Sequence, residues 1–134
     1  MRTIKILLLA VIASLMFAGC GNNAKTPSEI TKKVFIAAIN LDFNTIKQYL
    51  IEERIERLEE TEKDIAEDVE YANKLKKTLK NVTFKVVSET ISQDGNSAVV
   101  VIEVFNPAES DSGFEKEIKC TKVNDEWKVD SNPF

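Results

Sequence analysis

The hydrophobic residues of this chain change their spacing once, near residue 82, and this change limits the possible folds more than any other feature. Before it, apolar side chains recur at intervals of three and four residues, which is typical of helices. After it, they alternate with polar side chains, as in strands with one buried face. Helices followed by antiparallel strands predict an α+β domain, with the N-terminal helices packed on a sheet of about four strands.

Two short helices are expected first. Thr26 and Glu29 can form a capping box, and Pro27 suits the first helical position, so a helix is predicted over residues 27–40. A second short helix is expected over residues 42–50, where apolar side chains again share one face.

Residues 51–80 carry the longest amphipathic pattern. Acids predominate early and bases late, which suits a helix dipole. A cap between Thr61 and Asp64 would divide the segment near residue 60, so one helix and two helices both stay open. The stripe either covers the sheet of its own domain or forms a coiled-coil seam, and the two charges within it favour the first. The stripe consists of Ile51, Ile55, Leu58, Ile65, Val69, Ala72 and Leu79, with Glu62 and Lys76 at the two remaining positions.

The period of two predicts four strands. Residues 98–105 are apolar on both faces apart from Glu103, which is typical of a central strand covered on both sides. The other strands are expected from residue 82 onward, over 114–123 and over 126–130, with turns at 93–96 and 124–125.

The N-terminus has the three parts of a secretory signal: two bases within residues 1–5, an apolar run of about 12 residues, and a pair of small residues before Cys20. The apolar run is shorter than the roughly 20 residues that a spanning helix needs. The segment that ends Ala18-Gly19-Cys20 resembles the bacterial lipobox. This resemblance implies cleavage between Gly19 and Cys20, and a diacylglyceryl group and an N-acyl chain on Cys20.

We therefore expect a signal peptide over residues 1–19, a lipidated cysteine with a flexible tether over 20–25, and one domain over 26–134. Loss of Arg2 and Lys5 leaves 16 basic against 22 acidic residues, a net charge of −6. Such a domain is a poor candidate for nucleic-acid binding, which needs clustered bases. With Cys20 acylated, Cys120 has no partner for an internal disulfide and is expected to be a buried small hydrophobe.

Three segments resemble the nuclear transport factor 2-like superfamily, and within it small bacterial lipoprotein domains of unknown function. They are the helix end Ala37-Ala38-Ile39-Asn40-Leu41-Asp42-Phe43, the pair Tyr49-Leu50, and the terminal Asp125-Glu126-Trp127-Lys128-Val129-Asp130. The resemblance covers residues 26–132 and implies a cone, in which a curved sheet wraps around helices and can leave a pocket. Enzymes of this superfamily often pair Asp with His or Tyr, and this chain has no histidine.

The nearest substitutes for such a pair have simpler explanations. Asp42 suits a helix N-cap, Tyr49 the edge of the core, and Tyr71 a helix surface. Trp127 is interpreted as the core residue that closes the last strand, and a place for Tyr49 or Trp127 beside a pocket stays open. The glutamates between residues 52 and 62 are interpreted as a solvated helix face, and no metal site or bound cofactor is expected apart from the lipid.

These observations favour a membrane-anchored lipoprotein whose domain is monomeric and non-catalytic, and binds an envelope protein or a small ligand. Two alternatives stay open. One is an enzyme with a carboxylate-only pocket, and the other is an interaction protein that uses the segment 51–80. Gly21 after the cysteine gives no aspartate-type retention signal, so the outer membrane is the expected location in a Gram-negative host.

Overall fold

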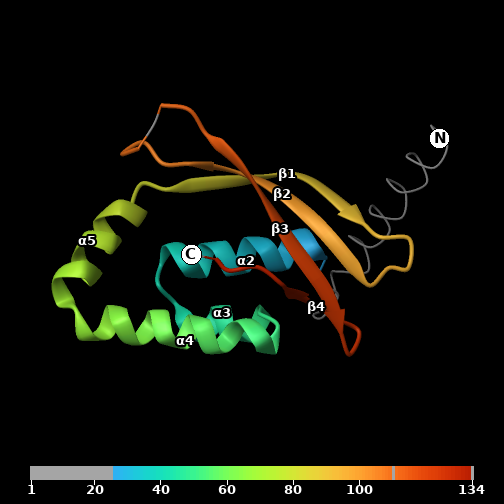
Figure 1. The fold of residues 1–134 in the computed structure, drawn as a ribbon. Helices are drawn as coiled ribbons and strands as arrows, with labels where there is room; N and C mark the ends of the chain where they lie inside the picture. The colour runs from blue at the N-terminus through green and yellow to red at the C-terminus, as the bar shows by residue number, and fades with distance from the viewer. Residues whose placement is uncertain (1–25, 110, 134) are drawn as a thin grey trace.

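The computed structural model describes residues 26–109 and 111–133. The expected signal peptide, the cleavage site at Gly19 and Cys20, and the tether therefore lie outside the described residues. The described part is an α+β domain of four helices and a four-stranded antiparallel sheet, so the predicted fold class is confirmed (Figure 1). Its elements are α2 (Pro27–Ile39), α3 (Phe43–Tyr49), α4 (Glu52–Glu67), α5 (Val69–Leu79), β1 (Thr83–Ile91), β2 (Ser97–Phe105), β3 (Phe114–Val123) and β4 (Glu126–Val129).

The sheet is a meander in the order β1-β2-β3-β4, because each strand pairs with the next along the chain. The predicted turns are confirmed. Gly95 has a φ of 75° between β1 and β2, and Asn124 and Asp125 have φ values of 52° and 64° between β3 and β4. The β1–β2 register shifts between Val86 and Ser88, which marks a bulge at Val87.

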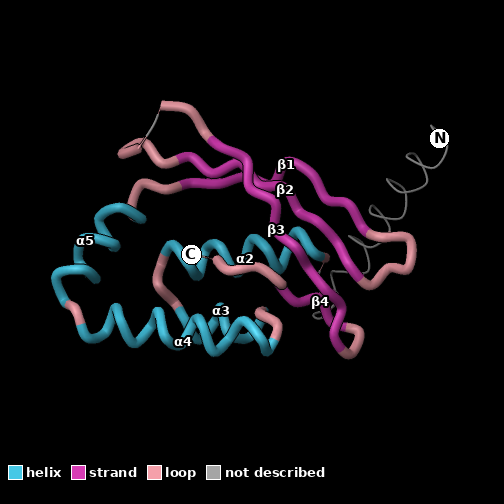
Figure 2. Tube along the Cα trace, viewed as in Figure 1, coloured by secondary structure: helices cyan, strands magenta, loops and turns pink. Residues whose placement is uncertain are grey.

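Helix α2 forms the middle layer of the domain. Its capping box is present, since Thr26 accepts a hydrogen bond from the backbone N–H of Glu29 and the Glu29 side chain accepts one from Thr26. Ile30 and Val34 are fully buried, and Figure 2 shows the helix lying along one face of the sheet. The main core joins this helix to the inward residues of the strands, among them Val100, Ile102, Ile118, Cys120 and Val129.

The segment 51–80 forms two helices, and the proposed break near residue 60 is wrong. Thr61 lies inside α4, where its hydroxyl donates to the carbonyl of Arg57. The break is at Asp68, which leaves the helical conformation and caps α5 by accepting a hydrogen bond from the N–H of Tyr71 at 3.0 Å. Asp68 is therefore the N-cap of the second helix, which the sequence suggested within residues 61–64.

The prediction that the stripe of this segment covers the sheet is also wrong. Helix α2 occupies that face, and α4 packs against α3 in a third layer, on the side of α2 away from the sheet (Figure 1). Leu58 and Ile65 do join the core, so part of the stripe is buried within its own domain. Glu62, within the stripe, pairs with Lys47 of α3 at 2.8 Å. This hydrogen bond raises the pKa of Lys47.

Strand β2 is central but is not covered on both sides, contrary to the prediction. Its inward residues Ala98, Val100 and Ile102 are buried, whereas Val99 and Val101 on the other face are half-buried. The outer face of the sheet carries charge, including an ion pair between Lys85 and Glu103 at 3.4 Å. Neighbouring side chains on the strands, without a second layer of helices, give the outer valines their partial cover.

Candidate functional site

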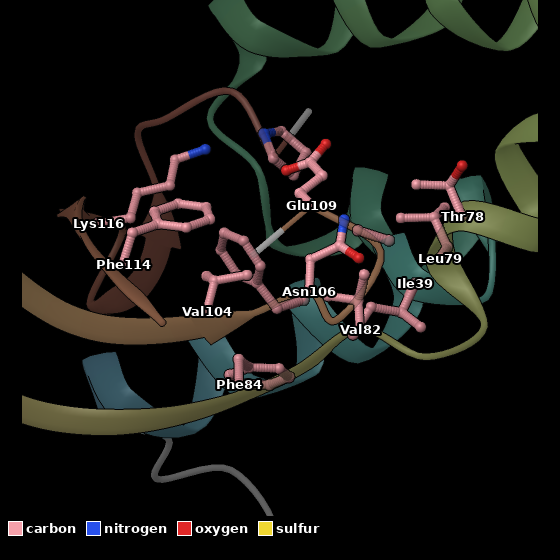
Figure 3. Close-up of a pocket in the computed structure, with 13 residues that line it drawn as sticks. Ile39, Thr78, Leu79, Val82, Phe84, Val104, Asn106, Glu109, Phe114 and Lys116 are labelled. Atoms are coloured by element: carbon pink, nitrogen blue, oxygen red, sulfur yellow. The ribbon is translucent and has the colours of Figure 1, made fainter. Parts of the chain in front are cut away.

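A pocket of about 340 Å³ opens at the end of the sheet where α5 leads into β1. It lies between the last turn of α2, the end of α5 and the ends of three strands (Figure 3). The pocket falls within the size range of small-molecule sites, about 300–1,000 Å³. It is lined by Phe35, Ala38, Ile39, Thr78, Leu79, Val82, Phe84, Val104, Asn106, Glu109, Phe114, Lys116 and Pro133.

Most of the lining is apolar, and several of its residues belong to the apolar faces of the helices. Ala38 and Ile39 end the apolar face of α2, and Leu79 ends the stripe of α5. The rings of Phe35 and Phe84 pack together in a tilted arrangement with centroids 5.7 Å apart. Phe114 is about half exposed (52%), so part of the apolar lining is open to solvent.

The polar groups of the pocket are few, and three of them come from two adjoining segments. Lys116 on β3 places its Nζ 5.8 Å from the centre of the Phe35 ring and forms no ion pair among the described residues. Asn106 follows β2, and its Oδ1 accepts a hydrogen bond from the N–H of Ala108 at 3.2 Å. Glu109 lies three residues further on, and its N–H donates to the carbonyl of Asn106 at 3.1 Å.

The fourth polar group, the hydroxyl of Thr78, forms a hydrogen bond within its own helix. The hydroxyl of Thr78 donates to the carbonyl of Lys74, one turn earlier in α5, at 3.0 Å. The pocket thus combines an apolar interior with one cation, one amide and one carboxylate in its lining. Such a lining suits binding of an apolar group, and it contains no Asp–His or Asp–Tyr pair for acid–base chemistry.

A model of a domain of unknown function, DUF4878, matches residues 18–130 of the chain. The chain belongs to the DUF4878 family. No curated protein and no solved structure matches it. The matched range includes all four described helices and all four strands, and therefore every element that borders the pocket.

The residues weighed from the sequence lie elsewhere in the DUF4878 domain. Asp42 is the N-cap of α3, as predicted, and accepts hydrogen bonds from the N–H and the hydroxyl of Thr45. Tyr71 is exposed on α5, also as predicted. Tyr49 and Trp127 are half-buried and pack against the core, but neither lines the pocket.

Trp127 is not the buried residue that closes the last strand, because Val129 has that place with no exposed surface. The indole remains at the edge of the core, with the Nζ of Lys122 5.3 Å above its ring. Strand β4 has only four residues, which is too short to cover the large Trp127 ring completely. The smaller Val129 side chain is fully covered.

Cys120 is buried, as predicted, with 1% of its surface exposed. Its Sγ lies 3.6 Å from the hydroxyl of Thr31, and burial raises the pKa of the thiol to about 11. Cys120 also borders a wider, more open depression of about 480 Å³ at the opposite end of the sheet, where polar side chains predominate. Among residues 26–109 and 111–133, no cluster of three or more acidic or cysteine side chains could hold a metal ion.

Lys116, Asn106 and Glu109 were not among the residues predicted from the sequence. A signal for Lys116 exists, because it alternates with Phe114, Ile118 and Cys120 and is therefore a charged residue among inward-facing positions of β3. Asn106 and Glu109 gave no such signal, since a polar loop after a strand is ordinary.

No helix within the described ranges is long and apolar enough to cross a bilayer.

Proposed function

We propose that this protein is a membrane-anchored lipoprotein of the nuclear transport factor 2-like type, whose domain binds a small apolar ligand without transforming it. The observation that carries the proposal is the largely apolar pocket between α2, α5 and the sheet. A pocket between helices and the concave side of a sheet is also what the superfamily resemblance implies.

The anchor is supported by the sequence alone: two bases, an apolar run, and Ala18-Gly19 before Cys20. Two or three acyl chains on Cys20 would hold the domain at the membrane, since each buried methylene contributes ~0.8 kcal/mol. In cells fed labelled palmitate, the full chain should acquire label and Cys20→Ser should not. Labelling and membrane retention of the serine variant would refute the anchor.

The pocket is tested with a neutral fluorescent probe, N-phenyl-1-naphthylamine, and the chain from residue 22 onward. This chain contains the whole core of the described domain, and a cooperative thermal transition should establish that it folds. We expect saturable binding at one site. Val82→Trp should abolish it by filling part of the pocket, whereas Val87→Trp, at an exposed valine that does not line the pocket, should leave it unchanged.

Equal probe binding by both variants would refute the pocket as the binding site. Conversion of a bound ester or glycoside by the domain, lost in the Val82 variant, would instead favour the carboxylate-only enzyme. Glu109 would then be the first residue to test, because it is the carboxylate in the lining.

A second candidate function, an interaction protein, is supported by α5. This helix has no buried residue, and Val69 and Tyr71 are 70% and 48% exposed. Sedimentation of the same chain over a wide concentration range distinguishes the two. We expect a monomer, because Leu58 and Ile65 are buried within the chain and leave only α5 for a seam. A dimer that Val69→Asp converts to a folded monomer would favour the interaction protein.

A further inference from the structure

The interior of the pocket is suited to a flexible hydrocarbon rather than to a ring system with internal polar atoms. Its inner walls are aliphatic and aromatic, and the hydroxyl proton of Thr78 is engaged within α5. A ligand with polar atoms along its length would leave them without partners in this interior, at a cost in affinity. A hydrocarbon chain with one polar end matches this lining, because the available polar groups come from β3 and the loop that follows β2.

The volume limits the length of such a chain. A water molecule occupies ~30 Å³ in the liquid and a methylene group slightly less, so 340 Å³ corresponds to about ten to twelve carbon atoms. The pocket is therefore too small for the two chains of a phospholipid but large enough for one chain of medium length.

The charge of the polar end follows from the donors beside it. Lys116 offers an ammonium group that no described carboxylate pairs. Because the Oδ1 of Asn106 accepts from Ala108, its Nδ2 is the atom of that amide left to donate to a ligand. Figure 3 draws both side chains, with Glu109, among the residues that line the pocket. The lining thus offers two donors, the ammonium and the amide, and one competing carboxylate, which favours an anionic head over a cationic one.

The pocket lies away from the start of the domain. Helix α2 runs from Pro27, next to the first described residue Thr26, to Ile39 at the pocket (Figure 1). Its 13 residues span about 20 Å, at 1.5 Å per residue. The pocket and the start of the domain are therefore at opposite ends of the helix.

We propose that the pocket binds a single-chain carboxylate, a fatty acid of about ten to twelve carbons, with its chain against Phe35, Val82 and Val104 and its head at Lys116 and Asn106. This proposal rests on the proposed pocket function and adds the class of ligand. Glu109 would weaken the binding of the head by repulsion between the two carboxylates.

The first experiment compares free ligands by calorimetry with the chain from residue 22, below their micelle concentrations. Octanoate, decanoate and dodecanoate should bind one to one. Each added methylene should improve affinity about fourfold, which corresponds to ~0.8 kcal/mol, until the pocket is full. Decanol and decyltrimethylammonium should bind more weakly than decanoate. Phosphatidylglycerol vesicles, which offer the same acyl chemistry within a bilayer, should not bind this unlipidated chain.

Variants then separate the head from the chain. Lys116→Met keeps the apolar stem and should weaken decanoate binding about fivefold while leaving decanol binding unchanged. Lys119→Met, three residues further along β3 on the other face, is the matched control and should change neither. Glu109→Gln should strengthen decanoate binding. Thermal unfolding of each variant establishes that it is folded.

The outcomes are distinguishable. If decanol binds as tightly as decanoate and Lys116→Met has no effect, the carboxylate head is wrong while the apolar pocket stands. If vesicles bind and decanoate does not, a bilayer lipid is the ligand and the proposal is overturned. If neither the neutral probe nor any chain binds, the pocket function and the ligand class fail together.

Discussion

One side chain of β1, Glu89, joins the first turn of α2 to the sheet by hydrogen bonds. Its Oε1 accepts a hydrogen bond from the N–H of Ser28 at 2.9 Å and another from the Ser28 hydroxyl at 2.8 Å. Ser28 lies in the first turn of α2, where backbone N–H groups have no partner within the helix. The carboxylate thus joins two elements 61 residues apart in the chain and completes the cap that Thr26 begins.

Replacement of Glu89 by alanine should destabilise the domain by ~2 kcal/mol. A carboxylate at a partly buried helix N-terminus contributes up to ~2 kcal/mol, and hydrogen bonds to charged groups ~1.5–3 kcal/mol each. Access of water to this part-buried site offsets some of that loss. For a domain of this size, the melting temperature should fall by roughly 10 °C, at ~4–8 °C per kcal/mol.

Urea unfolding followed by circular dichroism measures this effect. Glu117→Ala is the matched control, because Glu117 is exposed on β3 and faces away from α2. Glu89→Gln keeps an acceptor but loses the charge, so it should lie between wild type and Glu89→Ala. If Glu89→Ala and Glu117→Ala unfold within ~0.3 kcal/mol of each other, the reasoning about the helix N-terminus is refuted.

Three further predictions concern other parts of the domain. Cys120 should react slowly with a thiol reagent in the native domain and quickly after denaturation. Because burial raises the pKa of the thiol in the folded state, stability should fall as the pH rises from about 9, where the unfolded thiol ionises, to about 11, and less so in Cys120→Ala. Trp127→Ala should cost ~1.5–3 kcal/mol, below the ~3–5 kcal/mol of a fully buried aromatic, and a parent-like melting temperature would contradict its contact with the core. Asp125→Gly should stabilise the β3–β4 turn by ~0.5–1 kcal/mol in urea unfolding, since both turn residues have positive φ, and a loss of stability would be the contrary result.

Features determined by neighbours in the chain were predictable. The capping box of α2, the cap at Asp42 and the turns around Gly95 and Asn124 each depend on a few adjacent residues, and all are present. The break at Asp68 belongs to the same class, yet it was placed near residue 60. An aspartate inside a long acidic run gives a weak cap signal, because its side chain looks like one more solvated charge.

Features determined by distant segments were predictable only in part. Cys120 was placed correctly because the alternation along β3 fixes its face. The apolar character of residues 98–105 suggested cover on both faces, but valines flanked by long charged side chains such as Lys85 and Glu103 are sheltered without a second layer. The pocket could not be predicted, because its walls come from segments far apart in the chain that only the tertiary fold brings together.

The pocket follows from the way the chain uses its two amphipathic helices after α3. Helix α2 already fills the concave side of the sheet, so α4 can bury its apolar residues only against α3, one layer further out. The chain must then return to the sheet to begin β1, and the break at Asp68 lets α5 make that return as a separate helix. Since α5 spans the gap without burying any residue completely, its last turn forms a wall and leaves space between itself, α2 and the strands. The charges within the stripe are consistent with this arrangement, because Glu62 pairs with Lys47 on α3 and Lys76 on α5 is exposed to solvent.

A substitution that removes the N-cap at the junction of α4 and α5, Asp68→Ala, should therefore change the pocket more than the core. We expect weaker binding of N-phenyl-1-naphthylamine with a fall in stability of only ~1 kcal/mol, the usual cost of a lost N-cap. Unchanged binding in that variant would mean that α5 does not depend on its cap to form the wall.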